Sequence, residues 1–342
     1  MSDMRKAFLV DIIENIDDDT PRLVFADWLE DNGDPARAEF IRLQCRLAAE
    51  VGWVPPWNGY KNSGPFDDRE AALIAEHGGE WKKEAPKWAT KRFGFYRGFV
   101  SLVDGSAREW LEGVRALYRR TPVEGLDLQT HTNGEGRFLA VAARPECKYL
   151  RLLRFTTYGT ATDALRQFFA SADLRRLVTL EYGLHRNVIE SLGAMLASER
   201  LTQVRCLVLN RGEYGKEGAA LLATSALLAR LKSLRIWGAE KTETLAIELA
   251  RSPNVGGLEE LSLRASSLGD RGVVALASSP YLSKLRHLEI EHDILSDQSI
   301  RALTASPFFE NLIHLRSLRL TTHDCSGILA RLAERRRERG IE

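Results

Sequence analysis

Apolar residues recur along most of the chain at a fixed interval and in a fixed pattern. The segment 258–263, Leu-Glu-Glu-Leu-Ser-Leu, has leucine at its first, fourth and sixth positions. Such alternation over a short run predicts a β-strand that buries one face. The residues at the fourth position of the successive copies are separated by six intervals of 27 residues and one of 30, and they are Leu126, Leu153, Leu180, Leu207, Leu234, Leu261, Leu288 and Leu318.

A second apolar period lies between these strands and predicts one helix in each repeat. Apolar residues fall twelve and fifteen positions after each fourth-position residue, as Val273 and Leu276 do after Leu261. This i, i+3 spacing belongs to one face of a helix. Parallel strands lie about 4.8 Å apart and helices roughly 8–10 Å apart, so a stack of such units curves with its strands inside. Prolines that would end the helix occupy one equivalent position in four copies: Pro145, Pro253, Pro280 and Pro307.

These copies resemble the leucine-rich-repeat family, whose repeats of 20–29 residues alternate a strand with a helix. Copies such as 261–280 are similar to the helical, ribonuclease-inhibitor-like class. The resemblance implies an α/β solenoid of horseshoe form, with a parallel inner sheet and outer helices. One departure concerns the position at which many family members stack asparagine or cysteine, because here it holds His131, Tyr158, His185, Gly212, Ala239, Ser266, Asp293 and His323.

Residues 1–50 are predicted to form a small all-α domain of three short helices. Pro21 follows Thr20, and Pro35 follows Asp34, which is the pattern of an N-cap residue and a first-turn proline. Gly33 is expected to end the second helix. The residues expected to face the core are Phe8, Leu9, Ile12, Ile13 and Ile16 in the first helix, Leu23, Val24, Trp28 and Leu29 in the second, and Phe40, Ile41, Cys45 and Ala48 in the third.

The strings 20–30 and 33–44 resemble the repeat-companion domain that lies beside leucine-rich repeats in certain bacterial proteins. The resemblance implies a bacterial cytosolic protein and implies no known chemistry. Polar residues typical of that domain, which are Arg22, Asp27, Glu39 and Arg42, are expected to form ion pairs within it, with a docking surface as the alternative. The acidic run 17–19 precedes a helix and is expected to stabilise its N-terminus rather than to bind a metal.

The rest of the chain is predicted to be arranged around the repeats. Residues 51–92 are a linker loop followed by a helix at about 67–84, and the loop aromatics Trp53, Trp57 and Tyr60 either contact a partner or pack on the solenoid. Residues 93–122 are a degenerate capping repeat in which counting back one period from Leu126 gives Phe99, with helix positions at Leu111 and Val114. The repeats occupy 123–324, and residues 325–342 form a C-terminal capping helix.

The amino-acid composition restricts the kinds of partner and the cellular compartment that we expect for this chain. The chain has 342 residues, and 48 Lys and Arg stand against 47 Asp and Glu, for a formal net charge of +1. This balance creates no global field that would attract nucleic acid or an anionic membrane. The four cysteines show no disulfide framework, which suits a reducing compartment. Without a signal-peptide pattern or an apolar run of membrane-spanning length, the expectation is a cytoplasmic protein that does not enter a membrane.

Motifs that carry chemistry are missing from the sequence. Residues 212–217 contain two glycines and a lysine, but they lack the spacing and the hydroxyl residue of a phosphate-binding loop. His131, His185 and His323 never fall in adjacent repeats, so they are too far apart to share one zinc ion. We therefore expect no enzymatic activity, no cofactor, no metal and no small-molecule substrate.

The remaining functional surface is the concave face of the predicted sheet. Strand alternation sends the residues between the leucines to this face, among them Thr156 and Ser262. A tryptophan flanked by arginines is typical of a protein-binding hot spot. A protein-interaction scaffold is therefore the preferred function. The alternative function is binding of nucleic acid through Arg154, Arg235, Arg264 and Arg319. A third interpretation is that this face is only solvated and binds no partner. The candidate protein-binding residues are Asp127, Gln129, Arg154, Glu181, Asn210, Arg235, Trp237, Arg264, Glu289, Glu291 and Arg319.

Overall fold

The computed structural model divides into two compact units. The first comprises residues 1–155 and 172–177, and the second comprises residues 156–171 and 178–342. The predicted domain boundaries stay predictions. The aromatic loop with Trp53, Trp57 and Tyr60 and nearly all of the predicted capping helix at 325–342 lie outside the described residues. Those described are 3–51, 67–129, 135–156, 162–183, 188–239, 242–264, 268–290 and 296–317, with Leu332, Glu334 and Arg337.

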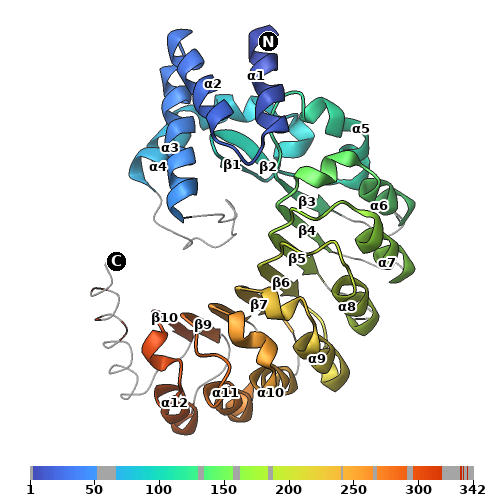
Figure 1. Cartoon of the computed structure of the whole chain (residues 1–342), viewed down its shortest axis with the longest axis vertical. Coiled ribbons are helices and arrows are strands. Elements are labelled where there is room, and N and C mark those ends of the chain that lie inside the picture. Colours follow the sequence, from blue (N-terminus) through green and yellow to red (C-terminus); the bar gives the residue numbers. More distant parts are fainter. Residues whose placement is uncertain are drawn as a thin grey trace. The chain divides into compact units, whose positions relative to one another are not determined.

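Helices dominate the beginning of the first unit (Figure 1). The helical elements are α1 (Asp3–Glu14), α2 (Thr20–Asp31), α3 (Pro35–Val51), α4 (Asp68–Trp81), α5 (Ala107–Leu117) and α6 (Glu135–Ala142), with 3-10 turns at Lys82–Glu84, Lys87–Thr90 and Pro145–Tyr149. The three predicted N-terminal helices and the helix predicted at 67–84 are confirmed. Gly33 adopts a φ of 86° directly after α2, and the Asp34 carboxylate accepts a hydrogen bond of 3.2 Å from the Arg37 backbone N–H.

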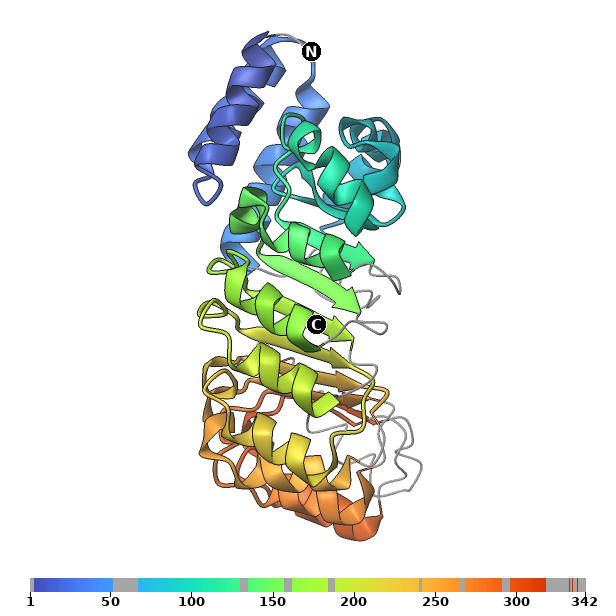
Figure 2. The ribbon, with the colours of Figure 1, turned by 90° about the vertical axis from the view of Figure 1, so that its right-hand side faces the viewer.

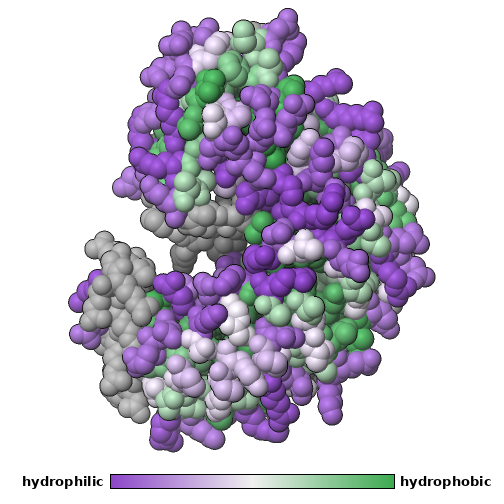
Figure 3. All heavy atoms as spheres, viewed as in Figure 1, coloured by the Kyte–Doolittle hydropathy of each residue, from purple (hydrophilic) through white to green (hydrophobic). Residues whose placement is uncertain are grey.

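The core face of α2 differs from the predicted one. Leu23 and Val24 are 39% and 49% exposed, and Figure 3 shows apolar residues at the surface over the N-terminal helices. Leu29 is buried as predicted, and Trp28 packs partly buried against the same core. The other buried residues of this face are Arg22, Phe25 and Ala26, which together with Leu29 form the core face. These four positions do follow helical spacing, but the pattern contains an arginine, which a search for apolar residues passes over.

The acidic run between α1 and α2 has a further role besides the predicted one. Two of the three carboxylates contact the start of α2: Asp18 accepts a hydrogen bond of 2.8 Å from the Thr20 backbone N–H, and Asp19 lies 3.9 Å from the Arg22 guanidinium. Asp19 lies 3.3 Å from the Arg97 guanidinium. Asp17 forms ion pairs with Arg151 and Arg176. Asp18 therefore stabilises the helix N-terminus as predicted. Asp17 and Asp19 in addition tie this turn to basic residues elsewhere in the first unit.

Two arginines are fully buried in the first unit. Arg22 lies 3.4 Å from Glu124, and burial raises the pKa of the Glu124 carboxyl while Arg22 and Arg97 oppose that rise. Arg37 donates a 2.5 Å hydrogen bond to Glu84. Its guanidinium carbon lies 4.8–5.9 Å from the ring centroids of the four aromatic residues that surround it, which are Phe40, Trp81, Phe95 and Phe99.

The strands of the first unit are β1 (Phe93–Tyr96), β2 (Phe99–Ser106), β3 (Gly125–Gln129) and β4 (Leu152–Thr156). β1 and β2 are antiparallel, and β2, β3 and β4 are parallel. The turn between β1 and β2 requires a glycine at position 98. Gly98 has a φ of 84°, and a Cβ added there would lie 2.3 Å from Ile41 Cγ1. Val103 lies opposite Leu126, so the prediction that Phe99 holds this position is wrong. The hairpin shortens this first repeat, and counting back by one full period does not allow for it.

The second unit repeats one strand and one helix. Its strands β5 to β10 are all parallel, in chain order. Helices α7 to α12 lie together on one side of them (Figure 1 and Figure 2). The elements are α7 (Thr162–Ser171), β5 (Thr179–Gly183), α8 (Val188–Leu196), β6 (Cys206–Asn210), α9 (Gly215–Thr224), β7 (Ser233–Trp237), α10 (Glu243–Arg251), β8 (Glu260–Arg264), α11 (Gly269–Ala277), β9 (His287–Ile290), α12 (Asp297–Thr304) and β10 (His314–Ser317), with 3-10 turns at Leu228–Arg230, Pro253–Gly257 and Phe309–Asn311.

The strand register follows the predicted period with one correction. Leu207, Leu234, Leu261, Leu288 and Leu315 lie opposite one another, and the interval between them is constant. The longer last interval predicted between Leu288 and Leu318 is therefore wrong, and Leu318 lies outside the described residues. No insertion is present, because Phe308 and Phe309 are buried in the turn before β10, at positions that leucines fill in an earlier repeat: Leu227 and Leu228.

The core of the second unit lies between the sheet and its helices. All described helix positions with the predicted spacing are buried: Leu165, Phe168, Leu192, Met195, Ala219, Leu222, Ala246, Leu249, Val273, Leu276, Ile300 and Leu303. Serine side chains also link successive repeats, because Ser252 and Ser279 donate to backbone carbonyls of the preceding repeat at 2.5 and 2.7 Å. No helix in the described ranges is long and apolar enough to cross a membrane.

Candidate functional site

The candidate binding face is the side of strands β5 to β9 that lies opposite the buried leucines. Strand alternation and the parallel register place its side chains in three rows. We call this surface the sheet face. Its rows are Thr179, Cys206, Ser233, Glu260 and His287; Glu181, Val208, Arg235, Ser262 and Glu289; and Gly183, Asn210, Trp237 and Arg264.

Arg235 is held against the sheet face by a carboxylate on the next strand. Its Nε and Nη2 donate to the two carboxylate oxygens of Glu260 at 2.7 and 2.9 Å. The Ser233 hydroxyl donates to the same carboxylate at 2.8 Å. A bidentate arginine–carboxylate pair fixes both side chains in one plane. The positive charge of Arg235 is thus compensated within the protein.

Trp237 lies at the centre of a second network. Its indole N–H donates to the Ser262 hydroxyl at 3.3 Å, and that hydroxyl donates to Glu289 at 2.7 Å. Arg264 lies 3.6 Å from the Glu289 carboxylate, and its guanidinium carbon lies 5.8 Å from the centroid of the Trp237 ring. That distance permits a cation–π contact. The ring is half-buried and is fixed by contacts on its edge and its face.

Two further predicted residues contact each other at one end of the sheet face. Asn210 donates to the Glu181 carboxylate at 2.8 Å, joining β6 to β5. Val208, which lies opposite Glu181 in the register, is buried. Polar contacts therefore extend over strands β5 to β9, and each one joins neighbouring repeats.

The predicted residues of β3 and β4 belong to the first unit and form their own group. Arg154 pairs with Asp127 at 3.2 Å, and Arg92 lies 3.7 Å from the same carboxylate. Gln129 donates to Asp104 at 3.3 Å. The nine described residues of the eleven predicted are thus found in two separate units, three in the first and six in the second. Glu291 and Arg319 lie outside the described residues.

Sequence reasoning misplaced one residue of the sheet face and missed another. Ser262 was expected to face solvent, but it is 1% exposed, because the longer side chains of Trp237 and Glu289 lie over it. Glu260 is not among the predicted binding residues, although its carboxylate binds the Arg235 guanidinium. The signal was present, because strand alternation around Leu261 applies to the residue before it as well as to the residues after it.

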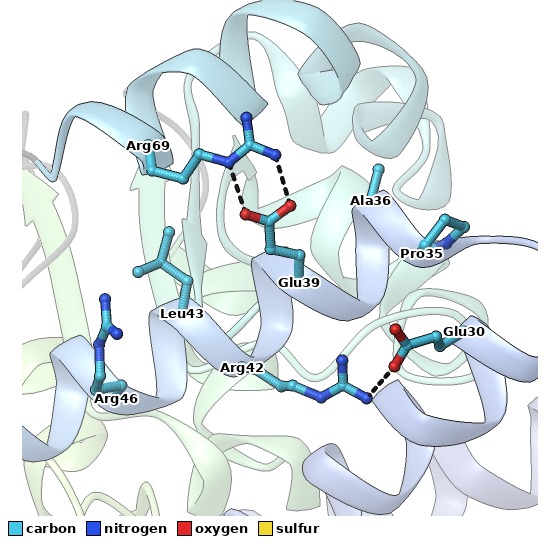
Figure 4. Close-up of a pocket in the computed structure, with 8 residues that line it drawn as sticks. All are labelled: Glu30, Pro35, Ala36, Glu39, Arg42, Leu43, Arg46 and Arg69. Carbon is cyan, nitrogen blue, oxygen red and sulfur yellow. Dashed lines mark hydrogen bonds and ion pairs between the residues drawn. The ribbon is translucent and has the colours of Figure 1, made fainter.

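The polar residues of α2 and α3 line a groove on the first unit, with a volume of about 840 Å³ (Figure 4). Arg69 donates to both carboxylate oxygens of Glu39 at 2.6 Å, and this hydrogen bonding lowers the pKa of Glu39. Arg42 donates to Asp27 at 2.6 Å and to Glu30 at 2.7 Å. The ion pairs predicted within residues 1–50 are therefore present for Asp27 and Arg42. Glu39 pairs instead with Arg69 of α4, outside that range.

The described cysteines do not have the character of nucleophiles. Burial raises the pKa of the Cys45 and Cys147 thiols to about 12, and it also raises the pKa of the Cys206 thiol. These groups remain protonated at neutral pH, whereas the thiolate is the reactive form. Within the described residues, no group of three or more His, Cys, Asp or Glu side chains is placed to hold a metal ion.

Comparison of the chain with protein-family models and with curated proteins gives no match. The class that the fold defines is an α/β protein in which strands alternate with helices at a constant period, an arrangement compatible with a repeat solenoid. The arrangement of the sheet face is the basis for assigning a function to it.

Proposed function

We propose that the chain is a bacterial, cytoplasmic leucine-rich-repeat protein that acts as a non-catalytic protein-interaction scaffold. Its partner binds the sheet face of the second unit, with Trp237 as the central contact. The sequence resemblance and the constant strand register support the family. The group of Asp127, Gln129 and Arg154 is a proposed contact surface of the first unit in its own right.

The observation that carries the proposal is the fixed, half-buried ring of Trp237. Tryptophan and arginine are enriched among residues that dominate protein-binding energies. Here Arg264 covers one face of the ring and Ser262 holds its N–H. Immobilising a side chain on binding costs about 0.5–1.5 kcal/mol. Contacts already present in the free protein reduce that cost.

Charge on the sheet face also bears on the kind of partner. Arg235 pairs with Glu260, and Arg264 pairs with Glu289. Nucleic-acid binding depends on cations that can neutralise phosphates, and these two are already compensated. A protein partner with mixed polar and apolar groups fits such a face better, so no second function is proposed for it.

Affinity capture tests the proposal. The full chain, a Trp237→Ala variant and an Arg251→Ala control would each be immobilised and exposed to a lysate of the source organism, with the retained proteins quantified by mass spectrometry. Arg251 is an exposed residue at the end of α10. We expect a protein that the wild type and the control retain and Trp237→Ala loses. Identical sets of proteins on all three would contradict the proposal.

A further inference from the structure

The turns that lead into strands β6 to β9 carry an excess of positive charge. These turns span residues 199–205, 226–232, 253–259 and 280–286. They contain two carboxylates, Glu199 and Glu259, against six cations. The formal excess is therefore four positive charges in a chain whose net charge is +1. The cations are Arg200, Arg205, Arg230, Lys232, Lys284 and Arg286.

Backbone hydrogen bonds set the spacing of these charges. The N–H of Lys232 donates to the Arg205 carbonyl at 2.7 Å, that of Glu259 to the Lys232 carbonyl at 2.8 Å, and that of Arg286 to the Glu259 carbonyl at 2.9 Å. Each step crosses from one parallel strand to the next, a distance of about 4.8 Å. The residues just before successive strands therefore lie side by side along one edge of the sheet, at a regular interval.

The cations of this edge are less compensated than those of the sheet face. Lys232 pairs with Glu259 at 2.7 Å. Among the described residues, no carboxylate pairs with Arg230, Lys284 or Arg286, and all three are exposed. Exposed cations that no neighbouring carboxylate compensates give a positive local potential, which favours an anionic ligand.

An aromatic ring lies in the same turns. Tyr281 is 39% exposed and precedes Lys284 by three residues. Its carbonyl oxygen lies 3.7 Å from the Cβ position of Gly256. A Cβ at Gly257 would lie 3.1 Å from the Leu231 carbonyl oxygen, which is a crowded contact. The pair of glycines adds no side chain to the strip between the turn of Arg230 and the turn of Lys284.

We propose that this strip binds single-stranded nucleic acid, and we call it the basic edge: Arg205, Arg230, Lys232, Lys284, Arg286 and Tyr281. The cations contact phosphates, and Tyr281 stacks on a base. Proteins that bind single strands without sequence preference combine these two features. The basic edge is distinct from the sheet face, so this activity goes beyond the proposed protein binding.

Fluorescence anisotropy of the full chain with labelled single-stranded RNA and DNA of about twelve nucleotides tests the proposal. The informative variant combines Arg230→Gln, Lys284→Gln and Arg286→Gln. Its matched control removes three exposed cations from α9, α10 and α11, through Lys216→Gln, Arg251→Gln and Arg271→Gln. Both variants change the net charge equally, so non-specific attraction affects them alike.

For the wild type we expect the logarithm of the binding constant to fall with the logarithm of salt concentration at a slope of about −3, since each neutralised phosphate contributes about −0.7. The edge variant should reduce that slope by about 2, and the control should leave it nearly unchanged. Tyr281→Ala should weaken binding about tenfold, because base stacking contributes about 1–3 kcal/mol. Its slope should stay that of the wild type.

Three results would overturn the proposal. The first is no binding even at about 50 mM salt, where phosphate contacts are strong. The second is an equal loss in the edge variant and in its control, which would show that only net charge matters. The third is tighter binding of a polyglutamate peptide with no effect of Tyr281→Ala, which would assign the basic edge to an acidic protein segment.

Discussion

The two compact units bury different kinds of side chain. In the first unit the buried polar residues include Arg22, Arg37, Asp104, Glu124 and Glu146. Among the described residues of the second unit, every buried polar side chain is a serine or a threonine. Stacked repeats close their core with leucines that recur at one spacing, whereas the first unit joins unlike elements through charge pairs. The periodicity of apolar residues in the sequence therefore predicts an apolar core, but it does not predict a core that contains buried ion pairs.

Replacement of Arg37 by alanine should give the largest effect on this comparison. The substitution leaves Glu84 without its buried partner and removes the cation that four aromatic rings surround. Breaking a buried ion pair costs about 3–5 kcal/mol, and we expect a loss of that size in the free energy of unfolding of the first unit. Urea denaturation followed by tryptophan fluorescence measures it, since six of the seven tryptophans precede residue 156.

Two further variants show whether burial of the charge matters. Arg108→Ala breaks an exposed ion pair with Glu112, and it should cost less than about 1 kcal/mol. Arg37→Met keeps much of the volume without the charge, and it should cost less than Arg37→Ala. Equal losses for Arg37→Ala and Arg108→Ala would remove the distinction between the two cores.

Leu261→Ala is the corresponding variant of the second unit. Leu261 is 1% exposed and lies between Leu234 and Leu288 in the register. Truncation of a buried leucine costs about 2–5 kcal/mol, because it removes apolar contacts and leaves a cavity. Ser262→Ala should cost about 1 kcal/mol through its lost hydrogen bonds. Thermal unfolding of the three proteins, followed by circular dichroism, compares them; similar losses would contradict the assigned register.

Ser252→Ala should have a smaller effect than Arg37→Ala or Leu261→Ala. The Ser252 hydroxyl donates to the Ala223 carbonyl of the preceding repeat and accepts from the Asn254 N–H. We expect a loss of about 1 kcal/mol, seen as faster amide hydrogen exchange in α9 and α10. The exposed Ser283 is the matched control, and Ser283→Ala should leave exchange unchanged. Uniform protection in both variants would show that the serine contacts do not couple the repeats.

The repeats were the most predictable part of the fold. Leucines and helix positions that recur at one constant interval indicated both the strand register and the buried helix faces. One error arose where a repeat departs from the period, at the hairpin before Val103. The other arose although the last repeat keeps the period, because residues 315–320 also fit the leucine pattern and led to Leu318 instead of Leu315. Arg22 was expected to form an ion pair within residues 1–50, but its buried partner, Glu124, lies far away in the sequence. A serine also recurs at the same interval, at positions 198, 225, 252, 279 and 306. It was not predicted to link the repeats, because the repeat pattern was defined by apolar residues alone.

The sheet face was predictable in position and not in its contacts. Alternation placed Arg235, Trp237 and Arg264 on one surface. It does not say which carboxylate each arginine meets, since Glu260 and Glu289 are chosen by side-chain reach across the strands. Burial of Ser262 likewise depends on the size of its neighbours.

The central claim is that Trp237 anchors a protein partner on the sheet face. Its most direct test is the dissociation constant of the captured partner, measured by calorimetry with the wild type, Trp237→Ala and the Arg251→Ala control. Loss of a central aromatic contact should weaken binding by about 2 kcal/mol or more, which is roughly thirtyfold, while the control stays within about twofold. A change below about threefold for Trp237→Ala would contradict the account.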